Sequence, residues 1–237
     1  MLNKLKKKLH ILQNIYIKNN YFFKRKSYAM DGEDTALLDY CENIKQGFYV
    51  DVGAHHPIQR SNTHLLYLKG WRGVNIDVSD FSLELFNFLR PDDLSIQSAI
   101  SDKDGEIELY YQKDFSQLST TNIRWAKENF NNSFKTKKIN SITLNTLLKN
   151  SIYKNKNIDF LNVDVEGAEL EVLTGLDFNI YKPKVLCIEI LGHRHLDSIN
   201  REESLQQDKI YEYLKNKNYK KVWSGSSFCS HLFLKNN

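Results

Sequence analysis

Residues 48–57 read Phe-Tyr-Val-Asp-Val-Gly-Ala-His-His-Pro. A short apolar run that ends in a carboxylate and a glycine is typical of a parallel strand followed by a turn. The segment from Ser61 to Gly70 then has helical spacing, with Ser61 as its predicted N-cap and Gly70 just past its end. Residues 48–70 therefore predict the first strand and helix of an open α/β sheet.

The same alternation continues outward from this stretch. Further strands are expected at 73–77, 94–100, 158–164 and 185–190, and helices at 34–41, 82–89, 144–148, 168–175 and 205–214. The segments 219–223 and 228–234 are expected to close the sheet as a hairpin, which places one antiparallel strand in an otherwise parallel sheet. Residues 106–111 alternate as an antiparallel strand does, and 112–135 are expected to form an irregular substrate loop. The predicted fold class is α/β, a Rossmann-like three-layer sandwich with a mostly parallel sheet.

Charge is divided unevenly along the 237 residues. The net charge is +4, but residues 1–30 contain eight basic and no acidic residues, so the remainder is slightly acidic. Within that stretch Leu5, Leu9, Leu12 and Tyr16 recur at helical spacing between lysines. We expect a basic N-terminal arm over 1–30 and one catalytic domain over 31–237. The arm is expected to be a solvated helix or a frayed segment; peripheral contact with a membrane, or with a partner, is the alternative.

Several classes of protein are excluded or disfavoured. Cys41, Cys187 and Cys229 are scattered without CxxC spacing, which excludes a cysteine-based zinc site and argues against a disulfide framework. There is no apolar run of about 20 residues and no signal peptide, so a cytoplasmic location is expected. A nucleic-acid partner is not expected, because nothing indicates a basic face around the crevice.

Ligands of open α/β sheets bind at the carboxyl ends of the strands, and four expected strands end in a carboxylate: Asp51, Asp77, Asp164 and Glu189. The first turn has one glycine where a dinucleotide fingerprint needs three, which disfavours NAD(P). A ligand with a positive centre, an amino-acid moiety and no phosphate suits this turn, and S-adenosylmethionine has these features. The cofactor-binding residues predicted on this basis are Asp51, Gly53, Ala54, Ser61, Asn62, Asp77, Val78, Ser98 and Ala99.

Within that set, each end of the cofactor has an expected partner. Asp77 is expected to accept both ribose hydroxyls, and Asp51 to attract the ammonium and the sulfonium. The helix N-terminus at Ser61–Asn62 is expected to receive the cofactor carboxylate, and Ser98–Ala99 to line the adenine.

The ordered motifs resemble the FkbM family of S-adenosylmethionine-dependent methyltransferases over roughly residues 27–235. They are 51–57, 61–63, 70–77, 99–102, 158–167 and 183–190, with Ser27-Tyr28 and Gly32-Glu33-Asp34 upstream. The resemblance implies a class I methyltransferase fold of seven strands with an antiparallel last strand. It also implies O-methylation, often of sugars in bacterial surface polysaccharides or of natural-product hydroxyls. Val78-Ser-Asp follows Asp77 where many members have Pro-Asn-Pro, so the sequence at the predicted adenine edge departs from that pattern.

A sugar hydroxyl is a poor nucleophile, so its proton must be removed or the oxygen must bind a metal. Asp164, Glu189 and His193 form one expected site, a carboxylate–carboxylate–imidazole set suited to Mn²⁺ or Mg²⁺. Metal-free catalysis with His56, His193 or Asp164 as general base is the rival. The purely structural alternative is that Glu166 and Glu189 cap helices and pair with Arg194 or Lys184.

Two further placements are left open. At least one of His55 and His56 is expected to face the crevice. Arg124 and Trp125 either read a sugar ring and an anionic group or belong to an ordinary surface helix.

The leading hypothesis is therefore an S-adenosylmethionine-dependent O-methyltransferase for a sugar, either a nucleotide-sugar or a surface-polysaccharide precursor. The acceptor is a small molecule or a glycan, and a homodimer is left open. A nucleotide-sugar epimerase or dehydrogenase would need a glycine-rich turn and a Tyr-xxx-Lys pair at the crevice; the turn is absent, and Tyr16 and Tyr219 have the wrong spacing and location for the pair. A catalytically silent module that binds polysaccharide-assembly partners has no need of Asp51, Asp77 and Asp164.

Overall fold

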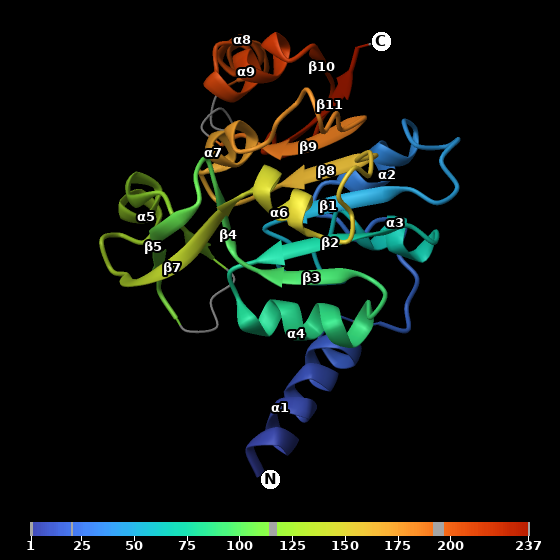
Figure 1. Cartoon of the computed structure of the whole chain (residues 1–237), viewed down its shortest axis with the longest axis vertical. Coiled ribbons are helices and arrows are strands. Elements are labelled where there is room, and N and C mark those ends of the chain that lie inside the picture. The colour runs from blue at the N-terminus through green and yellow to red at the C-terminus, as the bar shows by residue number, and fades with distance from the viewer. Residues whose placement is uncertain (1, 20, 114–117, 192–196, 237) are drawn as a thin grey trace.

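A computed structural model describes residues 2–19, 21–113, 118–191 and 197–236 (Figure 1). Its main sheet has seven strands in the order β10-β11-β9-β8-β1-β2-β3. They are β1 (Phe48–Val52), β2 (Arg72–Asp77), β3 (Leu94–Gln97), β8 (Phe160–Val163), β9 (Val185–Glu189), β10 (Tyr219–Ser224) and β11 (Ser230–Lys235).

The direction of the strands matches the sequence prediction. Neighbours from β9 through β8, β1 and β2 to β3 pair in parallel, and β11 pairs antiparallel with both β9 and β10. The α/β class and the mostly parallel seven-stranded sheet are therefore confirmed, with β11 as the antiparallel strand.

Helices cover both faces of this sheet, which is why β1 is buried along its whole length. One face packs against α2 (Glu33–Leu38) and α3 (His64–Leu68), through Leu37, Leu66 and Trp71. The other packs against α6 (Leu144–Asn150), α7 (Glu169–Thr174), α8 (Ser198–Gln206) and α9 (Lys209–Asn216). α4 (Asp80–Leu89) runs along β2 and β3. These layers hold the carboxyl ends of the parallel strands at one edge, on the left in Figure 1.

A second sheet stands at that edge, in the order β4-β7-β5-β6, and it was not predicted. It consists of β4 (Ala99–Ser101), β5 (Gly105–Tyr111), β6 (Ser119–Thr120) and β7 (Lys135–Thr143). The strand expected at 94–100 is broken at Ser98: β3 stays in the main sheet, and β4 begins the small one. The region expected as an irregular loop instead contains β6, α5 (Ile123–Asn129) and the start of β7.

The helix expected at 205–214 is also two helices. Asp208 stands between α8 and α9, and its Oδ1 accepts a hydrogen bond from the Ile210 amide at 2.8 Å. An aspartate that binds the amides of the next turn begins a new helix, so it separates the two.

The N-terminal arm is helical but is not simply solvated. It consists of α1 (Leu2–Leu12) and the π-helical turn η1 (Gln13–Ile17). Ile15 is fully buried against Ile58 and Leu85, and the buried Asn19 lies 3.1 Å from His56 Nε2. The arm therefore docks on α4 and on the loop after β1. Within the described residues, no helix is both long enough and apolar enough to cross a membrane.

Candidate active site

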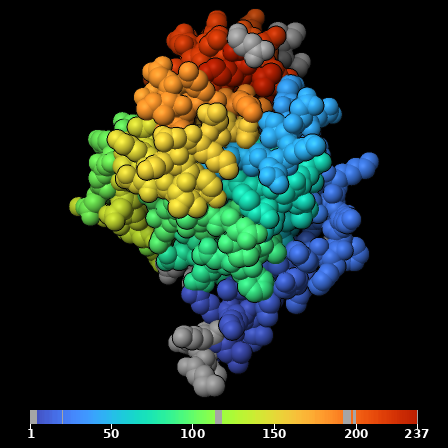
Figure 2. Space-filling model, turned by 45° about the vertical axis from the view of Figure 1, so that its right-hand side comes forward, coloured from blue at the N-terminus to red at the C-terminus, as the bar shows by residue number. Residues whose placement is uncertain are grey.

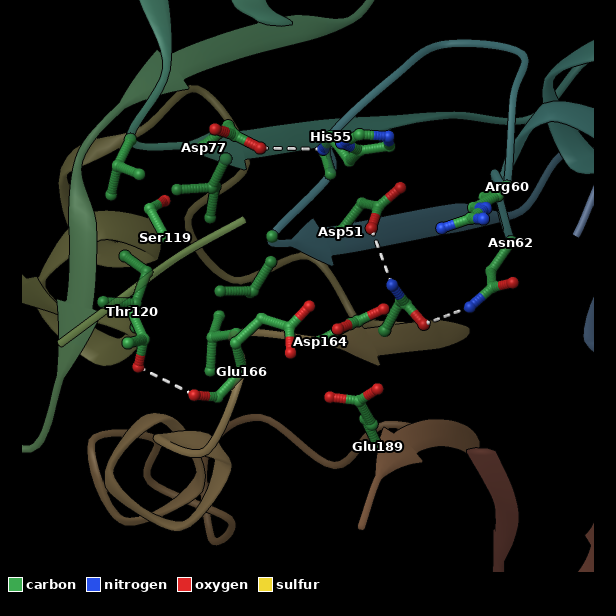
Figure 3. A pocket seen from close by; sticks show the side chains of 18 of the residues that line it. Asp51, His55, Arg60, Asn62, Asp77, Ser119, Thr120, Asp164, Glu166 and Glu189 are labelled. Carbon is green, nitrogen blue, oxygen red and sulfur yellow. Dashed lines mark hydrogen bonds between the residues drawn. The ribbon is translucent and has the colours of Figure 1, made fainter. Parts of the chain in front are cut away.

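A pocket of about 290 Å³ opens where the carboxyl ends of the parallel strands face the small sheet (Figure 3). Among the described lining residues six carry a carboxylate, and Arg60 is the single guanidinium. The six acids are Glu33, Asp51, Asp77, Asp164, Glu166 and Glu189. All nine predicted cofactor-binding residues line this pocket. An acidic cavity of this kind favours a cationic ligand.

Asp51, near the end of β1, is held by two donors. Its Oδ2 accepts a hydrogen bond from Thr63 Oγ1 at 2.7 Å, and its Oδ1 accepts one from Asn162 Nδ2 at 2.9 Å. Asn162 accepts in turn from Asn62 Nδ2 at 2.9 Å, which links the loop after β1 to β8. Burial raises the pKa of Asp51, and the two hydrogen bonds oppose that rise.

Asp77 ends β2 and is held by backbone amides. Oδ2 accepts from the His55 amide at 2.7 Å, and Oδ1 accepts from the Ser79 amide at 2.8 Å. Burial outweighs these bonds and raises the pKa of Asp77 to about 6. His55 has φ of 57°, a left-handed conformation rare outside glycine, which turns its amide toward Asp77.

Gly53 is required by the backbone rather than by a ligand contact. Its φ is 78°, and a Cβ at this position would lie 1.7 Å from the carbonyl oxygen of Asp164. No side chain fits there, so the β1 turn and the end of β8 approach each other only through a glycine. This contact places the Asp51 and Asp164 ends of the sheet side by side.

The loop from Pro57 to Thr63 rests on Arg90, which is fully buried at the end of α4. Its guanidinium donates to the Pro57 carbonyl at 2.5 Å, to Ser61 Oγ at 3.0 Å and to Thr63 Oγ1 at 2.9 Å. Arginine has several donors in a rigid fork, so one side chain fixes three points of the loop. The sequence offered no sign of this role.

The predicted helix N-terminus differs in detail. α3 begins at His64 rather than at Ser61, and Ser61 Oγ instead accepts a hydrogen bond from the His64 amide at 3.1 Å. Arg60, missed from the sequence, is exposed and lines the pocket at this end, with φ of 53°. It supplies the positive charge that the helix terminus was expected to supply.

At the opposite end, Val78, Ser98 and Ala99 line the pocket together with the apolar Ile76, Ile100 and Leu109. The Ser98 amide donates to the Asp77 carbonyl at 3.2 Å, which fixes the point where the chain leaves the main sheet. A site lined by apolar side chains beside a backbone turn is suited to an aromatic ring.

Three carboxylates face one another at the ends of β8 and β9. One oxygen each from Asp164, Glu166 and Glu189 lies within 4.8 Å of the others, and Glu189 Oε2 is buried with no hydrogen-bond partner. Burial and the neighbouring acids raise the pKa of Asp164 to about 6 and that of Glu189 well above its ordinary range. Because like charges at this distance repel, each carboxylate makes the ionised form of the other less favourable.

Glu166 joins this cluster through a strained turn. Its φ is 60°, its carbonyl accepts a hydrogen bond from Thr120 Oγ1 at 2.7 Å, and Gly167 follows with φ of 94°. Glu169 stabilises this turn, because its Oε1 accepts hydrogen bonds from the amides of Val165 and Gly167, both at 3.0 Å. Glu169 is thus a positioning residue that sequence reasoning missed.

The structural alternative for these acids is contradicted only where its residues are described. Lys184 pairs with Asp159 at 2.6 Å and not with Glu189, and it is Glu169 that binds the amides before α7. Arg194, the other proposed partner, lies outside the described residues, as does His193. The metal set of Asp164, Glu189 and His193 is therefore observed only for its two carboxylates, with Glu166 beside them.

Comparison with known proteins now bears on this pocket. The family model described as the methyltransferase FkbM domain matches residues 51–221. The chain belongs to this family. It is thus an S-adenosylmethionine-dependent methyltransferase, and the matched range contains all the predicted cofactor residues. No curated protein sequence is significantly similar to it. One solved structure, an O-methyltransferase from Bacillus cereus in complex with S-adenosylhomocysteine, has 10% sequence identity and a TM-score of 0.46, covering 94% of this chain and 89% of that one.

The histidines of this FkbM methyltransferase have different surroundings. His55 lines the pocket, but His56 does not; its Nδ1 accepts from the amides of Ile58 and Gln59, and Nε2 faces Asn19. Burial lowers the pKa of His56 to about 3. This placement supports a structural role for His56 rather than the predicted role of general base.

Arg124 and Trp125 lie on α5, outside the pocket. Arg124 is exposed, and the half-buried Trp125 packs against Phe130 and over Gly167, where a Cβ would come within 2.9 Å of its ring. In this FkbM methyltransferase Trp125 therefore supports the Glu166 turn from outside, and the sugar-reading alternative gains no support.

Proposed function

We propose that the protein is an O-methyltransferase that transfers the methyl group of S-adenosylmethionine to a hydroxyl of a sugar, in a nucleotide-sugar or a surface-polysaccharide precursor. The observation that carries the proposal is the Asp164–Glu189 pair. Both residues line the pocket together with Ser119 and Thr120 of β6, and the Asp164 carbonyl lies against Gly53, which follows β1. We also propose a cytoplasmic location, which the buried free thiols of all three cysteines favour.

The residues of the first two strands fit S-adenosylmethionine, which supplies an activated methyl group when bound. Asp77 would accept the ribose hydroxyls, because each of its oxygens has a lone pair left after the backbone bonds. Arg60 would pair with the carboxylate, and Asp51 would face the cationic part. Val78, Ser98 and Ala99 would contact the adenine.

The acceptor side is built for a hydroxylated molecule. Ser119, Thr120, Thr121 and Ser230 line the same pocket as Asp164 and Glu166. Hydroxyl side chains donate and accept, so they suit sugar hydroxyls better than an apolar or a charged acceptor. With a pKa of about 6, Asp164 is mostly ionised near neutral pH and more basic than an ordinary aspartate. It would take the proton of the acceptor hydroxyl.

The same three carboxylates would also suit a divalent cation. Asp164, Glu166 and Glu189 offer the oxygen ligands that Mg²⁺ and Mn²⁺ prefer, and a bound cation would relieve their repulsion. Such a cation would orient the acceptor oxygen and lower the pKa of its hydroxyl. Turnover that survives exhaustive EDTA treatment would assign proton removal to Asp164 alone, whereas restoration by Mg²⁺ or Mn²⁺ would assign it to a metal site.

The test begins with calorimetric titration of S-adenosylmethionine and S-adenosylhomocysteine into the full chain. Methyl transfer is then measured against a panel of nucleotide-sugars, with mass spectrometry of the products. We expect binding of both cofactor forms and a mass gain of one methyl on at least one sugar. Absence of cofactor binding would support the silent, partner-binding alternative. Cofactor binding with methylation only of non-sugar hydroxyls would overturn the acceptor class.

A further inference from the structure

The first helix of the arm has two different faces. Its inner face packs on α4: Lys7 pairs with Glu84, the rings of His10 and Phe81 lie 4.9 Å apart, and Ile11 contributes to the small core around Ile15. These contacts settle which way the helix is turned. The opposite face therefore points away from the domain.

That outer face is apolar. Leu5, Leu9 and Leu12 follow at i, i+4 and i+7, which places them on one stripe about half a turn away from Lys7 and Ile11. Leu5 and Leu9 are 57% exposed and Leu12 is 39% exposed. Three leucines aligned on the side that the domain does not use differ from scattered exposed leucines, which need no explanation.

The stripe continues into aromatic residues where the chain turns back toward the domain. Ile17 is 70% exposed, Phe22 78% and Phe23 70%. Phe22 stacks on Tyr16 at 5.7 Å between ring centres, and Tyr16 follows the leucines along the helix. We call Leu5, Leu9, Leu12, Ile17, Phe22 and Phe23 the arm surface. Figure 2 shows the arm standing out from the body of the molecule.

The charges around the arm surface are of one sign. Lys6 and Lys8 flank the leucine stripe on either side, and Lys18, Lys24 and Lys26 lie close to the aromatic residues in the sequence; all five are exposed. Residues 1–30 contain no acid at all. Apolar side chains flanked by lysines complement a surface with an apolar interior and an anionic outer layer.

We propose that the arm surface binds an anionic lipid bilayer, with its leucines and phenylalanines in the acyl boundary and its lysines at the headgroups. A second copy of the chain is the poorer occupant, because it would bring eight more basic residues and no acid to the contact. The proposal concerns where the enzyme works and does not depend on its acceptor or its chemistry.

Sedimentation of the full chain with vesicles tests this proposal. The vesicles contain phosphatidylcholine alone, or phosphatidylcholine with about one third phosphatidylglycerol. We expect strong binding to the anionic vesicles, weak binding to the neutral ones, and release at high salt. The L5S/L9S/F22S/F23S variant should bind anionic vesicles at least about tenfold more weakly.

Matched controls separate this surface from general stickiness. The L68S/I152S/I180S variant removes apolar residues that are 58%, 82% and 57% exposed elsewhere, and it should bind as the wild type does. Changing Lys6, Lys8, Lys24 and Lys26 to Gln should reduce binding to anionic vesicles, whereas K149Q/K154Q should not. An unchanged thermal midpoint for each variant establishes that the fold is kept.

Three outcomes would overturn the proposal. They are equal binding to neutral and anionic vesicles, equal binding by the arm variant and the control variant, and lipid-independent self-association that the arm variant abolishes. The last outcome, read by light scattering, would assign the arm surface to a second copy. Methyl transfer to a soluble acceptor is expected to be unchanged in the arm variant, so failure here is distinguishable from failure of the proposed function.

Discussion

The two halves of the pocket treat their carboxylates in opposite ways. At the ends of β1 and β2, Asp51 and Asp77 each accept two hydrogen bonds from groups that are themselves fixed. At the ends of β8 and β9, Asp164 and Glu189 face each other and Glu166, and one oxygen of Glu189 has no partner.

The two pairs of carboxylates therefore suit different tasks, one to hold a ligand in place and the other to react. A carboxylate held by donors stays in place and can present its free lone pairs to a ligand at little entropic cost. A carboxylate that faces other carboxylates is more basic than usual, so it takes up a proton or binds a cation more readily. The first arrangement suits the cofactor and the second suits the acceptor.

The largest effect is expected where the two halves touch. G53A places a Cβ against the Asp164 carbonyl and should lower the free energy of unfolding by about 3 kcal/mol or more. G70A is the matched control, since Gly70 has φ of 90° with no atom within 4 Å of the new Cβ, and it should cost about 1–2 kcal/mol. Urea unfolding of both variants measures this, and equal losses would refute the close contact.

The second prediction separates turnover from binding. D164N should lower kcat by about 10²- to 10⁴-fold, because the amide neither accepts the acceptor proton nor binds a cation well. Its dissociation constant for S-adenosylhomocysteine should stay within about threefold, roughly 0.7 kcal/mol. Stopped-time methylation assays give kcat, and calorimetry gives the dissociation constant. If D164N reduced kcat and cofactor affinity to the same extent, the division of the pocket into two functional halves would be wrong.

D77N is the converse experiment. It should weaken S-adenosylhomocysteine binding by about 10- to 100-fold, since hydrogen bonds to a charged group are worth about 1.5–3 kcal/mol. At saturating cofactor, kcat should remain close to the wild-type value. An unchanged dissociation constant would remove the ribose assignment from Asp77.

A smaller effect concerns pH. Burial raises the pKa of Asp164 to about 6, so between about pH 4 and pH 6 the folded protein keeps a proton that the unfolded chain releases. This group therefore stabilises the fold progressively less as the pH rises through that range. D164N should gain about 1–2 kcal/mol of stability relative to the wild type from pH 4 to pH 7.

The test uses the difference in the free energy of unfolding between D164N and the wild type, and not the pH dependence of either protein alone. Burial lowers the pKa values of His55, His56 and His64, and these groups change stability with pH in the opposite direction. Urea unfolding of the ligand-free wild type and D164N at several pH values gives the difference. A difference that does not vary with pH would mean that the Asp164–Glu189 pair takes up its protons at ordinary pKa values.

The smallest effect is expected for Arg60, which is exposed. R60Q should weaken cofactor binding by about 1.5- to fivefold, since a solvated ion pair contributes about 0.2–1 kcal/mol. The loss should diminish at high salt. R124Q, which changes an arginine outside the pocket, is the control and should bind as the wild type does.

That the residues at the ends of β1 and β2 line the pocket was predictable, because their sequence signals are local. Asp51, Gly53 and Asp77 stand at strand ends, where one stretch of sequence already implies both the strand and the turn. The position of Glu166 was harder to predict. Its side chain reaches the acidic cluster because its backbone is left-handed, and sequence patterns do not reveal that conformation. The role of Arg90 could not be predicted, because buried arginines are rare and no neighbouring motif indicates that its side chain binds the loop from Pro57 to Thr63.

The small sheet was missed for a related reason. β7 begins with three lysines in four residues and lacks the apolar alternation of a half-buried strand. Its pairing with β5 joins residues more than 20 positions apart, such as Tyr111 and Lys135. The arm was predicted as a basic helix, but its docking depends on Ile15 and Asn19, whose partners lie on the domain.

Because the chain leaves the main sheet at Ser98, the small sheet is an insertion in the main domain. The chain enters it through β4 and leaves it through β7, and these strands pair in parallel so that Ser101 lies opposite Thr143. An insertion whose two ends are neighbours can be exchanged without moving its host. Swapping residues 102–142 between members of the family would therefore exchange the part of the pocket wall that the small sheet forms, while leaving β1 and β2, and the cofactor-binding residues proposed on them, as they are.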